Sequence, residues 1–123
     1  MPITTIVSHL DRIIIGTARG EVTVKDIAGF AGGIVRPGLL HYRKQLSLTD
    51  GVLRIAADEV RALAQALGEI KQERTRGPLA IVANPDQEEM AGLFAAIGSD
   101  FHPVRVCPSI REARQWLDTF TVS

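Results

Sequence analysis

Three histidines and a single cysteine are the side chains of this 123-residue chain that most readily bind metals or act as nucleophiles. His9, His41 and His102 fall in three separate segments, and none has a second ligand at the short spacing of a zinc site. Cys107 lies where an expected strand meets a helix start, and amide dipoles there favour a thiolate. His102, five residues earlier, would point to the opposite face of that strand, about 16 Å away. We therefore expect a packing cysteine, no metal site, no cofactor and no catalytic residue.

Motifs that bind phosphate groups or carry out hydrolysis are missing from the sequence. Neither a G-x-x-x-x-G-K-[ST] phosphate loop nor a Gly-x-Ser-x-Gly elbow occurs. The closely spaced glycines of the first expected helix lie within a helical pattern, so they do not form a dinucleotide-binding turn. An enzyme would therefore depend on residues that only the fold brings together, and a buried cluster of His41, Tyr42 and Asp58 with strongly perturbed pKa values would support one.

Positive charge is densest in residues 36–44. Arg36, His41, Tyr42 and Arg43 could contact the phosphate or carboxylate of a ligand, with the tyrosine phenol adding a hydrogen bond. The same charges also suit a solvated strand entrance, where they discourage pairing between the sheets of different molecules. Both interpretations, an anion-binding segment and a solvated edge, stay open at this point.

The elements that must position these residues follow from the hydrophobic pattern. Strands are expected at 4–8, 13–18, 43–48, 78–83 and 101–107, and helices at 24–35, 58–71, 85–98 and 110–120. A Thr-Asp-Gly turn at 49–51 is expected to end the third strand. Only four residues join the first two strands, which favours an antiparallel hairpin, whereas the later strands alternate with helices. The sequence therefore predicts an α/β fold with one mixed sheet, largely parallel after its first pair, in a single domain over residues 1–123.

Capping signals mark two of the helix starts. Thr23 precedes Asp26, and Ser109 precedes Glu112, at the spacing of a capping box. The last helix is expected to direct Ile110 toward the core because its apolar residues recur at helical spacing.

Composition narrows the class of protein. Fourteen Lys and Arg residues balance fourteen Asp and Glu residues, so the formal net charge is zero, which argues against a nucleic-acid binder. No apolar run approaches the roughly 20 residues of a membrane-spanning helix, and the first residues do not read as a secretory signal. One cysteine fits a reducing compartment. We therefore expect a cytoplasmic protein without a nucleic-acid partner and without stable membrane insertion.

Five short segments resemble those of bacterial SpoIIAA-like proteins. They are Gly-Glu-Val-Thr at 20–23, Tyr-Arg-Lys at 42–44, Asp-Glu-Val-Arg-Ala-Leu-Ala at 58–64, Ile-Val-Ala at 81–83 and Glu-Ala-Arg-Gln-Trp-Leu at 112–117. That family is similar to STAS domains and is described as STAS/SEC14-like. The resemblance covers nearly the whole chain, and it implies a mixed sheet with about four helices packed mainly on one face.

One STAS feature is not present. Regulatory STAS proteins carry an Asp-Ser-Ser-Gly stretch at the start of the second helix, and a partner kinase phosphorylates its second serine. The matching residues here are Ala56, Ala57, Asp58 and Glu59. Without a hydroxyl group this position cannot accept a phosphate, so we expect no phosphorylation switch here. Asp58 either supplies a fixed negative charge or only starts the helix.

The leading functional hypothesis is a non-enzymatic regulatory module that binds a protein partner, or a second copy of itself as a homodimer. Its contact surface would be the start of the second helix and the loop before it, comprising Leu53, Arg54, Ala57, Asp58 and Arg61. A homodimer would also cover a sheet face or edge that helices on one side leave exposed.

The alternative hypothesis is a carrier or sensor of a small apolar or amphipathic molecule, which the SEC14-like resemblance implies. Ile27, Phe30 and Ile34 of the first helix would flank its pocket. Residues 36–44 would then meet an anionic head group of the ligand.

Overall fold

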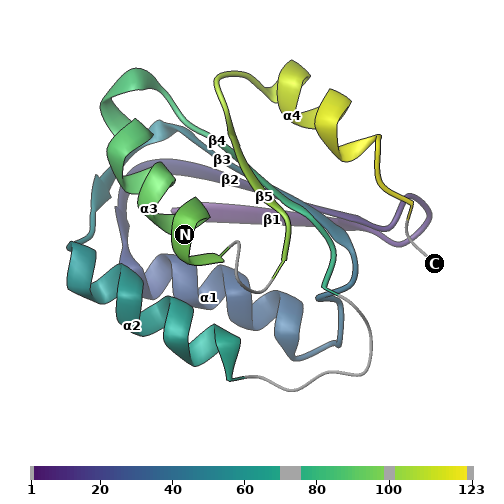
Figure 1. Cartoon of the computed structure of the whole chain (residues 1–123), viewed down its shortest axis with the longest axis horizontal. Helices are drawn as coiled ribbons and strands as arrows, with labels where there is room; N and C mark the ends of the chain where they lie inside the picture. Colours follow the sequence, from purple (N-terminus) through teal and green to yellow (C-terminus); the bar gives the residue numbers. More distant parts are fainter. Residues whose placement is uncertain (1, 70–75, 99–101, 122–123) are drawn as a thin grey trace.

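A computed structural model of the chain describes residues 2–69, 76–98 and 102–121. These residues form a five-stranded sheet and four α-helices, with one short 3₁₀ helix, η1 (Figure 1). The elements are β1 (Ile3–Ser8), β2 (Ile13–Thr23), α1 (Val24–Val35), β3 (Arg43–Arg54), α2 (Ala57–Gly68), β4 (Leu79–Val82), η1 (Pro85–Gln87), α3 (Glu88–Gly98), β5 (Val104–Cys107) and α4 (Ile110–Leu117). The predicted order of strands and α-helices is confirmed.

The strands are arranged in the order β1-β2-β3-β4-β5. β1 pairs with β2 in the antiparallel sense, and every later pair of neighbours is parallel. Residues 9–12 close the opening hairpin, with Arg12 in the left-handed region at φ 51°. The expected hairpin and the expected mixed sheet are therefore both present.

Helices cover the two faces of the sheet unequally (Figure 1). α1, α2 and α3 pack on one face, where the larger apolar core forms around strand residues such as Ile14 and Ile81. α4 packs on the other face, where Val82 and Leu117 are buried. Because successive strand residues point to opposite faces, β2, β4 and β5 contribute residues to both cores. Most of the helical mass thus lies on one side, as the resemblance implies.

Side chains cap the helices at the predicted positions. Before α1, the backbone N–H of Thr23 donates to the Asp26 carboxylate at 2.8 Å. Before α4, the Ser109 hydroxyl accepts from the backbone N–H of Glu112 at 3.2 Å. These bonds satisfy amide groups that lack a partner within the first helical turn or just before it, and they fix where α1 and α4 begin.

The third strand is longer than the sequence predicts. β3 continues through the expected turn at 49–51, because β2 pairs with it as far as Thr23 opposite Arg54. Gly51 permits this close pairing, since a Cβ at that position would lie 3.1 Å from Cγ2 of Val22. The cross-strand partner therefore overrides the local turn signal.

Ile110 also differs from its prediction. It is 52% exposed because it is the first residue of α4, whose buried positions are Ala113 and Leu117. The predicted helix end at Lys71 and the predicted strand start at Phe101 lie outside the described residues.

Candidate functional site

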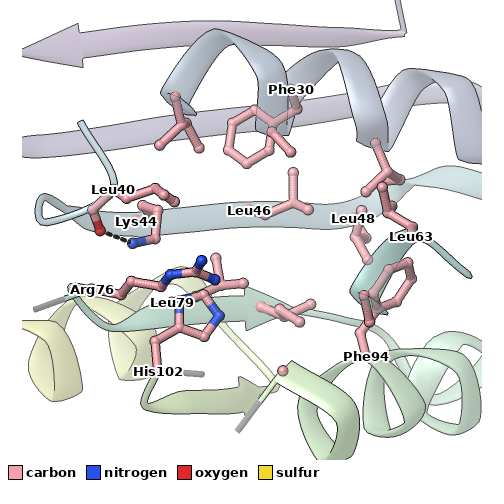
Figure 2. A pocket seen from close by; sticks show the side chains of 16 residues that line it. Phe30, Leu40, Lys44, Leu46, Leu48, Leu63, Arg76, Leu79, Phe94 and His102 are labelled. Carbon is pink, nitrogen blue, oxygen red and sulfur yellow. Dashed lines mark hydrogen bonds between the residues drawn. The ribbon is translucent and has the colours of Figure 1, made fainter. Parts of the chain in front are cut away.

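A cavity of about 110 Å³ lies between the sheet and the three helices α1, α2 and α3 (Figure 2). Most of its lining is apolar and comes from both layers, including Phe30, Leu46, Leu48, Leu63, Leu79 and Phe94. The lining strand residues share one face because they alternate along β3 and β4. The cavity therefore lies against the larger core and is partly open to the surface.

Three basic side chains lie together at one end of this cavity (Figure 2). Lys44 comes from the start of β3, Arg76 from the segment before β4, and His102 from the segment before β5. The opposite end is formed by apolar side chains, among them Leu63 and Phe94. Among the described residues, no Asp or Glu lines the cavity. It thus has one cationic end and one apolar end.

Lys44 is almost completely buried, with 2% of its surface exposed. Its ammonium group donates to the backbone carbonyls of Leu40 at 2.7 Å, Tyr42 at 3.1 Å and Gly77 at 2.9 Å. These three acceptors match the three donors of a protonated lysine. The side chain therefore ties the segment before β3 to the segment before β4, and it reaches the cavity through its charge rather than through a free donor.

The pKa values of Lys44 and His102, at the cationic end of the cavity, are both lowered. Burial, and then the nearby Arg76 guanidinium, lowers the pKa of Lys44 to about 7. Burial, and then the charges of Lys44 and Arg76, lowers the pKa of His102 to about 4, although a hydrogen bond with the Gly77 backbone acts in the opposite direction. No carboxylate of the described residues contributes to either shift. His102 is therefore neutral at pH 7, and a bound anion would stabilise the protonated form of both groups.

Gly77 allows the basic groups to approach each other. Its backbone N–H donates to the Leu40 carbonyl at 2.8 Å. A Cβ at this position would overlap the carbonyl oxygens of His41 and Tyr42. Only glycine lets this segment pack so closely against the start of β3, which places Arg76 beside Lys44.

The four residues predicted as anion contacts do not line the cavity. Arg36 is exposed after the end of α1. The Tyr42 hydroxyl lies 2.8 Å from Nδ1 of His9, and the His41 ring meets the Tyr42 ring edge-on at a centroid distance of 4.9 Å. Arg43 points to the α4 side, where it donates to the Asp11 carbonyl at 2.7 Å and lies 3.4 Å from the Asp118 carboxylate.

Part of the predicted partner surface lines a second, larger depression of about 860 Å³. Leu53, Ala57 and Arg61 contribute to this groove, which lies at the carboxyl ends of β3 and β4. Arg54 instead forms an exposed pair with Glu21 at 3.6 Å. Asp58 is exposed at the start of α2, and it is not among the groove residues.

The acidic side of the groove comes from η1 and the start of α3. Asp86 and Glu89 line it there, beside the apolar Met90. Beneath them the buried Gln87 side chain donates to the carbonyls of Leu48 at 2.6 Å and Gly51 at 2.8 Å. These bonds hold η1 against the end of β3 and so fix the floor of the groove.

The three residues considered as a catalytic cluster, His41, Tyr42 and Asp58, are not brought together. His41 and Tyr42 precede the amino end of β3, whereas Asp58 follows its carboxyl end, with the twelve residues of β3 between them. Cys107 is 3% exposed, and burial raises the pKa of its thiol. Within the described ranges, no group of three or more metal-ligating side chains occurs, and no helix has the length and apolarity to cross a membrane.

The sequence pattern contained part of the signal for the cavity. Ile27, Phe30 and Ile34, expected to flank a pocket, all line it. Lys44 alternates with Leu46 and Leu48 on β3, which places its side chain on the core face. Arg76 and His102 gave no such signal, because only the parallel pairing of β3, β4 and β5 brings the segments before these strands together.

No protein-family model matches the sequence, and no curated protein matches it. Among solved structures, the fold is similar to that of an uncharacterised protein of the DUF3478 family with a SpoIIAA-like fold from Shewanella loihica PV-4. The TM-score is 0.57 at 17% sequence identity, and the match covers 94% of this chain and 91% of that chain. The chain therefore has a SpoIIAA-like fold, as the short sequence segments predicted.

Proposed function

We propose that this SpoIIAA-like fold serves as a non-enzymatic carrier or sensor of a small amphipathic molecule, which it binds in the cavity between the sheet and α1, α2 and α3. The observation that carries the proposal is the combination of an apolar cavity with three basic side chains at one end. An amphipathic ligand matches both ends at once, because its hydrocarbon part is removed from water while its polar group meets Lys44, Arg76 and His102.

The size of the cavity supports a ligand rather than a packing defect. Protein interiors are close-packed, so an apolar space of about 110 Å³ is larger than the ordinary gaps between packed side chains. An engineered apolar cavity of about 150 Å³ in another protein accepts benzene. A hydrocarbon group of comparable or slightly smaller size would fill the space here.

The test is direct measurement of binding by the purified chain. Native mass spectrometry after mild purification should detect a co-purified small molecule, and thermal unfolding should shift upward by several degrees in a panel containing hexanoate, 1-hexanol and benzyl alcohol. Leu63→Trp should abolish the shift by filling the cavity, whereas Ile110→Trp on α4 should retain it. Protein that is ligand-free and unresponsive to every compound would contradict the proposal.

A second candidate function, docking of a protein partner, is favoured by the groove beside α2. The groove combines exposed apolar surface, including Val52 at 50% exposure, with the carboxylates of Asp86 and Glu89. A basic, partly apolar segment of a partner would match this surface. Cross-linking in the source cells should recover a partner that Asp86→Lys and Glu89→Lys variants lose. Recovery unaffected by both substitutions would exclude this surface. The proposed regulation does not involve phosphorylation at the start of α2, where no hydroxyl group is present.

A second copy of the chain is the other partner that we propose to test. β1 is an edge strand, and Ile6 on it is 62% exposed. Sedimentation velocity at micromolar concentration should show a homodimer that Ile6→Lys converts to a monomer. A wild-type monomer at that concentration would contradict self-association.

A further inference from the structure

β1 leaves one side of its backbone without a partner strand in the described part of the chain. It forms an edge of the sheet, beside β2. The backbone N–H of Arg19 donates to the Pro2 carbonyl at 2.8 Å, and this bond fixes which backbone groups face β2. Because alternate residues direct their N–H and C=O groups to opposite sides, the even-numbered residues of β1 face β2. The outward groups therefore belong to its odd-numbered residues, Ile3, Thr5 and Val7.

This edge lacks the features that usually keep edge strands apart. Native edges are protected by charged side chains, prolines, bulges or a covering element. Residues 3–8 contain no charged residue and no proline, and they pair with β2 without a break in register. Ile6 and Val7 are both exposed. The edge thus presents unused donors and acceptors among uncharged side chains, which do not repel a copy of themselves.

We propose that the β1 strand of a second copy pairs with this edge about a two-fold axis, with Thr5 opposite Thr5, so that the two sheets become continuous. The inference rests on the self-association proposed above, because it states where and in which register the copies meet. A strand that meets its own copy about such an axis pairs in the antiparallel sense. Ile3 of each copy then lies opposite Val7 of the other, and each outward-facing pair exchanges two backbone hydrogen bonds.

The outward groups select this register over its nearest alternative. The alternative sets Ile6 opposite Ile6. It would place the outward groups of Ile3 opposite His9, which lies in the turn after β1. With Thr5 opposite Thr5, every outward-facing residue of β1 has a partner within β1. The side chains match as well, because two apolar residues or two threonines then lie opposite each other.

Helix α1 lies beside this edge, on the face of the sheet that carries the larger core. It contacts both β1 and β2. The ring of Phe30, near the middle of α1, would meet a Cβ added to Gly16, which is the partner of Thr5. A two-fold axis through Thr5 therefore passes the middle of α1 and brings the α1 helices of the two copies side by side.

The two α1 helices would be close enough to pack against each other. Strands lie about 4.8 Å apart, so helices centred between β1 and β2 of each copy would be about 10 Å apart. Packed helices are about 8–10 Å apart. Gly29 and Gly33 lie on the flank opposite Ala31, which lines the cavity on the α2 side. A Cβ at either glycine meets no other part of the chain within 4 Å, so this flank is open to the second copy.

The extent of this contact predicts a weak dimer. β1 has 6 residues and extends about 20 Å. α1 has 12 residues and extends about 18 Å. A contact of these dimensions lies at the lower end of specific interfaces, which bury about 1,200 Å² in total. We therefore expect a dissociation constant in the low micromolar range.

Sedimentation velocity of matched variants tests the position of the contact. Thr5→Pro removes an outward N–H and no hydrogen bond of the monomer, so it should weaken dimerisation at least tenfold while the monomer stays folded. Gly33→Leu should also weaken dimerisation at least tenfold, because it fills the space between the α1 helices. Ala28→Leu, at an exposed position on another side of α1, is the matched control and should leave the dissociation constant unchanged.

Intermolecular disulfides test the register. Opposite residues of a hydrogen-bonded pair have Cα atoms about 5.5 Å apart, which is within the range of a disulfide. Thr5→Cys should therefore form a covalent dimer on mild oxidation. Ile6→Cys should not, because its copy is a diagonal neighbour about 7–8 Å away. The wild-type chain is the control, since its buried Cys107 should form no covalent dimer.

The contrary outcomes separate this inference from self-association itself. A wild-type monomer throughout the micromolar range would contradict both. A dimer that Thr5→Pro leaves intact would overturn the pairing at β1, and one that Gly33→Leu leaves intact would overturn the contact between α1 helices. Self-association would stand in these two cases. Cross-linking of Ile6→Cys in preference to Thr5→Cys would overturn the register.

Discussion

Lys44 shows how one buried cation can organise two segments that are distant in the sequence. Three backbone carbonyls take the place of the water molecules that would otherwise hydrate its ammonium group. Two of these carbonyls belong to the segment before β3 and one belongs to Gly77. A lysine with 2% exposure would otherwise carry a large desolvation cost. The structural role of this residue and its effect on the cavity therefore have the same origin, a positive charge held in place by the backbone.

Replacing Lys44 with methionine should destabilise the protein by about 2–4 kcal/mol, because it removes three hydrogen bonds from an ammonium group to backbone carbonyls. Urea denaturation at pH 7 measures the free energy of unfolding. Lys25→Met, at an exposed position on α1, is the matched control and should change it by less than about 0.5 kcal/mol. Equal stability of the two variants would show that the three hydrogen bonds contribute nothing.

His102 should make the folded state sensitive to mild acid. Its pKa in the folded protein, about 4, lies below the ordinary value of 6.5, so the unfolded chain binds more protons between these pH values. The free energy of unfolding should therefore fall by about 2–3 kcal/mol as the pH decreases from 6.5 to 4. His102→Gln should remove this part of the slope. The measured quantity is the slope of the free energy of unfolding against pH. A substitution that lowers stability equally at every pH leaves this slope unchanged, so it can be distinguished from the expected effect.

Cys107 should react slowly with thiol reagents in the folded protein. Its side chain is buried against α4, and burial raises the pKa of the thiol, so little reactive thiolate is exposed. A thiol-specific colorimetric reagent at pH 8 should modify it at least a hundredfold faster in 6 M urea than in buffer, provided that the protein is unfolded there. Rapid modification in buffer would reveal an accessible, activated thiol instead.

At the scale of elements, the sequence predicted what depends on neighbouring residues. The hairpin, the alternation of later strands with helices, and the caps at Thr23 and Ser109 all follow from short-range spacing, and all are present. The extension of β3 past residues 49–51 could not be predicted, because it depends on pairing with β2. The position of Arg76 at the cavity could not be predicted for the same reason, because the pairing of parallel strands brings loops that are distant in the sequence to the same end of the sheet.

The segment before β4 gives a prediction at this scale. Gly77→Ala should destabilise the protein by about 2–4 kcal/mol and weaken ligand binding, because the added Cβ overlaps backbone carbonyls and forces the segment away from β3. Gly33→Ala is the control: this glycine is exposed on α1 with open space around its Cβ position, so alanine should stabilise by about 0.5–1 kcal/mol. Chemical denaturation and calorimetry of both variants measure the two effects, and a Gly77→Ala protein as stable as wild type would show that the close approach is dispensable.

At the scale of the whole molecule, the cavity should appear in the volume change of unfolding. Pressure favours unfolded chains because internal voids disappear on unfolding. Ala31→Leu adds a side chain to the cavity from α1, so it should reduce the magnitude of the unfolding volume by roughly tens of mL/mol. Ala28→Leu, exposed on the same helix, should leave it unchanged. High-pressure fluorescence of Trp116 measures the volume change of unfolding for both variants. Identical volume changes would contradict the presence of a void beside α1.

The two ends of β3 contribute residues to two different surfaces. Lys44 belongs to the cavity at the amino end of the strand, whereas Leu53 belongs to the groove at its carboxyl end. The loops that form one surface are separate from those that form the other. If the proposed ligand and the proposed partner both bind, a mutation at the cavity can alter the choice of ligand without disturbing the groove, and a mutation at the groove can alter the choice of partner without remodelling the cavity. In this architecture, the two proposed specificities would be free to evolve independently.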